Sequence, residues 1–222
     1  DSIKINALSY IIDNLKTHPT LALLVLNYSR FDTINSQIIK ESNFNIQQEE
    51  VHNNARKFIE EEIKYNIFGF GFMTSQIYRT DAVRMALQKW QNSFDNLESQ
   101  VFWGAYSGLQ GSVKFSRDVF VEYTCETNGL SNKKVWFKVH YSDLPRVYIK
   151  LREIGYSKKF CQQLIIHHFT KENTLRRLIG GIRRFPIMGL KTAIPYLILV
   201  IKTFAESVLS LFISLFSLRF GG

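Results

Sequence analysis

The strongest constraint on the fold is a run of eight residues, Leu21–Tyr28, which reads LALLVLNY. It has the length of a β-strand, and the Pro19 before it ends the preceding helical pattern because proline cannot continue a helix. A strand that is apolar without alternation is buried on both faces, as in a parallel or mixed sheet. With 45% hydrophobic residues the chain can bury a sizeable core. We therefore expect an α/β fold, with a mixed sheet flanked by helices.

The remaining elements follow from apolar periodicity and turn signals. Helical spacing predicts helices at 2–16, 49–65, 80–90, 93–106, 142–155 and 156–170. Apolar or alternating runs predict strands at 36–40, 68–78, 111–123 and 135–141. The run at 111–123 is expected to form one or two short strands at the sheet edge. Gly155 is expected to cap the C-terminus of the helix at 142–155. The polar segment 29–54 is expected to be a long excursion of the kind that forms lids or binding loops.

A glycine-interrupted aromatic run at 68–78 is the first candidate for a ligand site. Gly69 and Gly71 would weaken a strand, and such glycines often mark a bulge or a close approach of a ligand to the backbone. Ser75 follows toward the end of this run, where ligands bind in open α/β sheets. The simpler interpretation is a core strand that ends in a turn-forming serine.

Two carboxylates, Asp95 and Glu98, stand at the start of the next helical pattern. Residues three apart share one side of a helix, so either acid can serve as a general base. Acids in a first turn are also favoured by the helix dipole, which is the simpler interpretation.

The net charge of +9 is concentrated toward the C-terminus. Such an excess can face nucleic acid, anionic lipid or a phosphorylated substrate. Because no RNP, zinc-finger or helix-turn-helix signature accompanies it, we expect no nucleic-acid partner. Cys125 and Cys161 are too few for a disulfide framework and suit a reducing compartment.

The last fifty residues change character. Residues 173–191 are basic and broken by glycines, and 192–220 are apolar but interrupted by Lys202 and Glu206. The uncharged runs fall short of the roughly 18–20 residues that a spanning helix needs. Basic residues before an apolar helix favour a peripheral anchor on an anionic membrane surface. A buried helix pair and a tilted span are the alternatives.

The order of elements resembles the C-terminal half of a bacterial family 2 glycosyltransferase with the GT-A fold. The resemblance rests on four segments: LALLVLNYSRFD, FGFGFMTSQIYRTDAV, GSVKFSRDVFVEY and DLPRVYIKLREIGYSKKF. It implies a partial GT-A-like catalytic domain at 1–141, a helical extension at 142–172 and a membrane-associating tail at 173–222. The nucleotide-binding half of that family would precede Asp1, so this chain by itself is expected to be inactive.

The resemblance also implies substrates and roles. A nucleoside-diphosphate sugar would donate its glycosyl group to a saccharide or lipid-linked acceptor in surface polysaccharide synthesis. A divalent cation, Mg²⁺ or Mn²⁺, would be held by Asp1, as the last acid of a DxD-type motif. Lys134 and His140 would face the diphosphate, and Asp95 or Glu98 would be the base. The protein would lie at the cytoplasmic face of the inner membrane. A non-catalytic, membrane-docked interaction module is the alternative.

Overall fold

The structure is a computed structural model that describes residues 1–125, 132–172 and 174–220, with only the backbone described for 125 and 211–220. The chain forms two compact units, Asp1–Asn132 (unit 1) and Lys133–Gly222 (unit 2), each with its own buried core. Residues 133–141, expected in the first domain, are grouped with the helices that follow them.

Unit 1 is an α/β layer structure built on a mixed sheet, which confirms the expected fold class. Its described strands are β1 (Ser2–Ile3), β2 (Leu21–Asp32), β3 (Gln37–Lys40), β4 (Val51–His52), β5 (Gln76–Tyr78) and β6 (Ser112–Cys125). The order is β1-β6-β2-β3, with β4 also paired to β6 and β5 to β2. Only β2 and β6 run parallel among these pairs. The β2–β6 pair is therefore the interior of the sheet.

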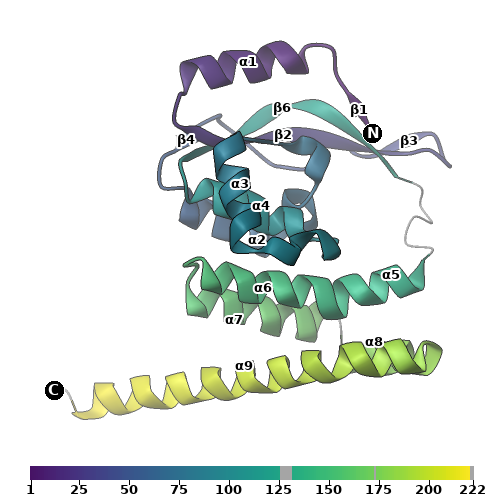
Figure 1. Cartoon of the computed structure of the whole chain (residues 1–222), viewed down its shortest axis with the longest axis vertical. Helices are drawn as coiled ribbons and strands as arrows, with labels where there is room; N and C mark the ends of the chain where they lie inside the picture. The colour runs from purple at the N-terminus through teal and green to yellow at the C-terminus, as the bar shows by residue number, and fades with distance from the viewer. Residues whose placement is uncertain (126–131, 173, 221–222) are drawn as a thin grey trace. The chain divides into compact units, whose positions relative to one another are not determined.

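Helices cover both faces of this sheet (Figure 1). They are α1 (Ala7–Thr17) on one face, and α2 (Ala55–Phe70), α3 (Thr80–Lys89) and α4 (Ser99–Gly108) on the other. Helix α1 packs through Tyr10, whose ring stacks on Phe120 at 4.3 Å, and leaves Leu8 and Ile12 exposed. Because both sheet faces are covered, β2 is buried from Leu21 to Ser29, as its apolar run predicts.

Four sequence predictions in unit 1 were wrong in their boundaries or type. The strand expected at 68–78 is mostly helix: α2 continues to Phe70, a 3₁₀ turn (η1, Met73–Ser75) follows, and β5 holds three residues. Helix α2 starts at Ala55 instead of residue 49, and α4 starts at Ser99 instead of 93 after the 3₁₀ segment η2 (Gln91–Asp95). Strand β6 is one long interior strand, not an edge strand.

A buried amide, Asn27, joins the parallel pair to the segment after β3. Its side-chain nitrogen donates to the Ser42 hydroxyl and to the carbonyls of Phe44 and Arg117, at 2.8–3.1 Å. Its oxygen accepts from the backbone N–H groups of Tyr28, Asn43 and Phe44 at 2.9–3.1 Å. The residue is fully buried, so these contacts replace the water that the amide loses on folding.

Unit 2 is helical in the residues described. It contains α5 (Lys133–Lys138), the π-helical segment η3 (Val139–Asp143), α6 (Leu144–Glu153), α7 (Lys158–His167), the π-helical segment η4 (His168–Glu172), α8 (Leu175–Arg184) and α9 (Pro186–Phe220). The strand expected at 135–141 is thus helix. Gly155 has φ 106° after α6, which confirms its predicted capping role. Cys161 is buried.

We predict that Asn27→Ala destabilises unit 1 by about 3 kcal/mol or more, because several buried backbone groups lose their partner at once. Urea denaturation followed by far-UV circular dichroism measures this change. Asn53→Ala removes an exposed amide from the same unit and should change the free energy of unfolding by less than about 0.5 kcal/mol. Equal effects of the two substitutions would contradict the role given to Asn27.

Candidate functional site

The turn between α2 and β5, residues 71–75, brings several predicted site residues together in unit 1. Gly71 closes α2, its N–H donating to the Ile67 carbonyl at 2.8 Å. Ser75 is fully buried, and its hydroxyl donates to the Phe72 carbonyl at 2.7 Å. The Ser75 side chain therefore holds the turn in place, and the half-buried Thr74 beside it is the hydroxyl that reaches outward.

Glu98 lies over this turn. The Glu98 Oε2 atom is 3.5 Å from the position that a Cβ would take on Gly71, and Val101 Cγ2 is 2.8 Å from that position. A side chain at residue 71 would thus displace its neighbours, which explains a glycine here by close packing. The Glu98 N–H donates to the Asn96 side-chain oxygen at 2.9 Å, which fixes the start of α4. Glu98 is half-buried, whereas Asp95 is exposed in η2.

Asp1, the residue before β1, contacts the same turn. The Thr74 hydroxyl donates to Asp1 Oδ2 at 2.9 Å. Strand β1 holds this position, because Ser2 pairs with Glu122 on β6. Two predicted site acids, Asp1 and Glu98, therefore meet one turn. Thr74, which donates to Asp1, is a third site residue to which the sequence analysis assigned no role. Its position next to Ser75 is the sequence feature that could have pointed to it.

Aromatic rings on β2 and β6 pack against the turn through Phe72. The Phe72 ring lies 4.5 Å from Tyr28 on β2 and 4.9 Å from Tyr123 on β6. Burial raises the pKa of Tyr28, so its hydroxyl stays neutral. The Arg30 guanidinium lies 5.8 Å from the centre of the Tyr123 ring. The turn is thus anchored near the carboxyl ends of the two parallel strands, where ligands bind in open α/β sheets.

Gly69, which was also predicted as a site residue, has different neighbours from Gly71. A Cβ at this position would overlap the side-chain amides of Asn43 and Asn66. Asn66 itself has non-helical backbone angles within α2. Close packing of these two amides therefore accounts for a glycine at 69.

Lys134 and His140, expected near a diphosphate, belong to unit 2. Lys134 is exposed on α5. His140 is buried: its ring lies 4.2 Å from Trp136, and its carbonyl is 2.7 Å from Nε2 of His168. His168 Nδ1 contacts the Tyr148 hydroxyl at 3.2 Å. The two π-helical segments thus each contribute one buried histidine to a single cluster.

Chemically, the turn offers oxygen ligands and a carboxylate beside a close-packed glycine. Asp1 and Thr74 present hard oxygen atoms of the kind that Mg²⁺ and Mn²⁺ prefer. Among the described side chains there is no group of three or more His, Cys, Asp or Glu residues that could hold a metal ion. Asp1 and Thr74 fit a Mg²⁺-type site only as part of a ligand set, because such ions usually take one or two protein carboxylates and complete their shell with water and substrate phosphate.

Comparisons with protein-family models, with curated proteins and with solved structures found no match to this chain.

Helix α9 contains a long apolar stretch. Its residues Pro186–Ser210 are long and apolar enough to cross a membrane, a property that a buried helix of a soluble protein can share. Its inward face is buried at Ala193, Tyr196 and Val200. Glu206, whose charge interrupts the stretch, contacts Lys158 at 2.8 Å and Arg152 at 3.8 Å.

We predict that the buried histidines make unit 2 sensitive to acid. Burial lowers the pKa of His140 to about 3 and that of His168 to about 4, from 6.5. Below pH 6.5 the unfolded chain therefore binds more protons than the folded one, and the free energy of unfolding falls as the pH drops toward 4. The slope is up to about 1.4 kcal/mol per pH unit for each histidine.

Denaturant unfolding at a series of pH values measures this slope. The double substitution His140→Gln and His168→Gln should flatten it, whatever its effect at pH 7. His167→Gln removes an exposed neighbour whose charge is a minor cause of the lowered pKa of His168, so it should change the slope far less than the double substitution does. A slope unaltered by the double substitution would contradict the assignment.

Proposed function

We propose that unit 1 is the acceptor-side part of a glycosyltransferase that uses a nucleoside-diphosphate sugar. The observation that supports this most is that two distant acids reach the turn 71–75: Asp1 accepts a hydrogen bond from Thr74, and Glu98 lies beside Gly71. A half-buried carboxylate beside a close-packed glycine suits proton removal from an acceptor hydroxyl. The resemblance to family 2 glycosyltransferases supplies the reaction class.

In the proposed reaction, Glu98 takes the proton of the acceptor hydroxyl. The acceptor oxygen then forms a bond to the anomeric carbon of the donor, and the bond from that carbon to the diphosphate oxygen breaks. Glu98 is preferred to Asp95 because Glu98 touches the turn, whereas Asp95 lies exposed in η2. Asp1 and Thr74 would hold a Mg²⁺ or Mn²⁺ ion, which offsets the charge of the leaving diphosphate when it is bound.

We predict that Glu98→Gln lowers turnover in the full-length protein at least about a hundredfold, the usual size of a general-base contribution. Asp95→Asn, a matched loss of one carboxylate three residues earlier, should leave turnover within about threefold. The measurement is release of nucleoside diphosphate from a panel of nucleotide sugars with Mn²⁺. The assignment is wrong if Glu98→Gln retains full activity or if Asp95→Asn is the damaging change.

We further propose that α9 lies along an anionic membrane surface, peripherally, on the cytoplasmic face. Its outward face carries exposed apolar residues at helical spacing: Ile187, Leu190, Ile194, Ile198, Ile201 and Val208. Cationic residues accompany this apolar stripe on α8 and α9: Arg176, Arg177, Arg183, Arg184, Lys191 and Lys202. Such a helix buries its apolar face at the headgroup boundary while its cations meet anionic lipid.

The environment of Glu206 favours this arrangement over a span. Its carboxylate lies among Lys158, Arg152 and Gln162. The hydrogen bond from Lys158 chiefly, and the charges of Lys158 and Arg152, lower the pKa of Glu206. A spanning α9 would have to carry this charge into the hydrocarbon core without those partners, which is costly. A helix in the interface plane keeps them.

We predict that Ile198→Glu weakens binding to phosphatidylcholine vesicles containing phosphatidylglycerol about tenfold or more, because one apolar anchor is lost. Gln163→Glu adds the same charge at an exposed position of α7 and is the matched control. Vesicle flotation measures the bound fraction, which high salt should also reduce. Retention that resists both salt and alkali would identify a spanning helix and contradict the proposal.

A further inference from the structure

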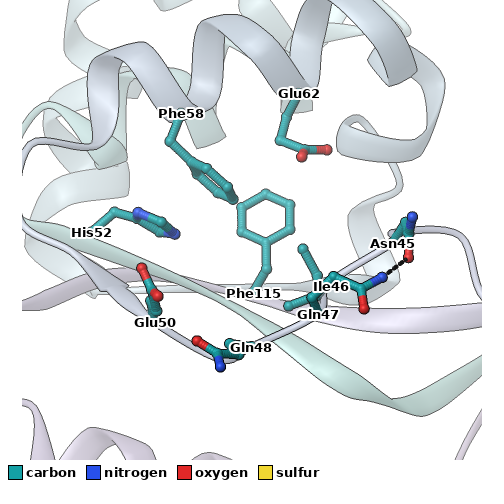
Figure 2. A pocket seen from close by; sticks show the side chains of 9 residues that line it. All are labelled: Asn45, Ile46, Gln47, Gln48, Glu50, His52, Phe58, Glu62 and Phe115. Carbon is teal, nitrogen blue, oxygen red and sulfur yellow. Dashed lines mark hydrogen bonds between the residues drawn. The ribbon is translucent and has the colours of Figure 1, made fainter.

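Unit 1 contains a pocket of about 340 Å³ that no part of the proposed reaction uses. It lies between the segment 45–52 and the helix α2, with Phe115 of β6 at its base, and Figure 2 shows its lining side chains. Pockets that bind small ligands in proteins start at about 300 Å³, so the volume suits a compact ligand.

The polar lining consists of amides and carboxylates. Asn45, Gln47 and Gln48 come from the polar segment, and Glu50 and Glu62 stand on opposite sides of the pocket. No lysine or arginine is among the lining residues, and two carboxylates repel anions. This chemistry disfavours phosphate, nucleotide or carboxylate ligands. It favours a ligand rich in hydroxyl groups, because amides both donate and accept while carboxylates accept.

The apolar lining is aromatic apart from Ile46. The Phe58 and Phe115 rings are perpendicular, with centroids 4.9 Å apart, and the His52 ring stacks on Phe58 at 3.9 Å. Stacking by His52 covers one face of Phe58 and fixes its orientation. Aromatic rings carry negative charge on their faces, which attracts the C–H groups along one side of a sugar ring.

The wall of the pocket is held in position before any ligand binds. Glu49, between Gln48 and Glu50, accepts hydrogen bonds from the Tyr10 hydroxyl and the Arg117 N–H, both at 2.8 Å. It also pairs with Lys114 at 2.9 Å. Although burial acts in the opposite direction, these hydrogen bonds lower the pKa of Glu49. A preformed wall reduces the entropy that a ligand would lose by ordering it.

Glu62 faces the pocket from α2. Burial raises the pKa of this carboxyl, and the charge of the neighbouring Glu61 adds to the effect. A partly desolvated carboxyl gains more than an exposed one from a hydroxyl donor, because it has already lost water.

We propose that this pocket binds a neutral or amino-substituted saccharide unit, separately from the turn 71–75. The half-buried Phe58, backed by the buried Phe115, takes the apolar side of the ring, and the amides and the two carboxylates take its hydroxyl groups. This gives a binding role to residues 45–52, which belong to the polar segment 29–54 that was expected to form a lid or binding loop. The inference does not depend on the proposed glycosyl transfer, since the pocket shares none of its residues.

A printed array of mono- and disaccharides, with neutral, amino and uronic-acid members, tests the proposal with the full chain. We expect retention of neutral or amino sugars and none of uronic acids. Phe58→Ala and Glu62→Gln should each reduce retention about tenfold, the loss expected for one aromatic contact or one charged hydrogen bond. Glu60→Gln, on the same helix but outside the lining, should leave it unchanged.

Thermal unfolding by circular dichroism identifies a variant that fails to fold, and Gln48→Ala, at an exposed site, then replaces it. The proposal is overturned if no sugar is retained, if uronic acids are preferred, or if the pocket variants bind like Glu60→Gln. None of these results would bear on the proposed glycosyl transfer, which the Glu98→Gln substitution tests separately.

Discussion

Unit 1 depends on the parallel pairing of β2 and β6. This pair forms the interior of the sheet, and the remaining strands attach to it from both sides. Asn27 reinforces it at mid-length: its backbone N–H donates to the Ser116 hydroxyl at 2.7 Å, while its amide holds the segment after β3. Burying an amide in an apolar core costs little free energy when all its hydrogen bonds are made, and much more when one partner is missing. The register between β2 and β6 shifts on both sides of Asn27, so these hydrogen bonds hold the pair together where its ladder is irregular.

The location of the candidate site follows from that register. Because β5 pairs antiparallel to β2, the turn before β5 comes to lie toward the carboxyl ends of the parallel strands. Strand β1 pairs near the end of β6 and brings Asp1 to the same place. Packing of α4 against α2 then sets Glu98 over Gly71. Residues that are far apart in sequence thus converge because each is attached to the central pair.

The sequence predicts the parts of this arrangement that rest on strong local patterns. The run Leu21–Tyr28 correctly predicts a doubly covered strand in a mixed sheet, and Thr80 and Gly155 mark helix ends correctly. The run at 68–78 is misleading, because a short aromatic run with glycines fits a strand or the end of a helix, and tertiary packing decides between them. The convergence of Asp1 with Thr74 depends on long-range pairing that no local pattern encodes.

We propose that donor and acceptor chemistry meet at the turn 71–75. Anomalous scattering from Mn²⁺, in crystals of the full-length protein soaked with Mn²⁺ and a nucleoside diphosphate, locates the metal directly. We predict a peak bound by the Asp1 carboxylate beside Thr74, with Glu98 facing the terminal phosphate, to which the sugar of the donor would be attached. A peak held by other residues, with the nucleotide away from this turn, would contradict it.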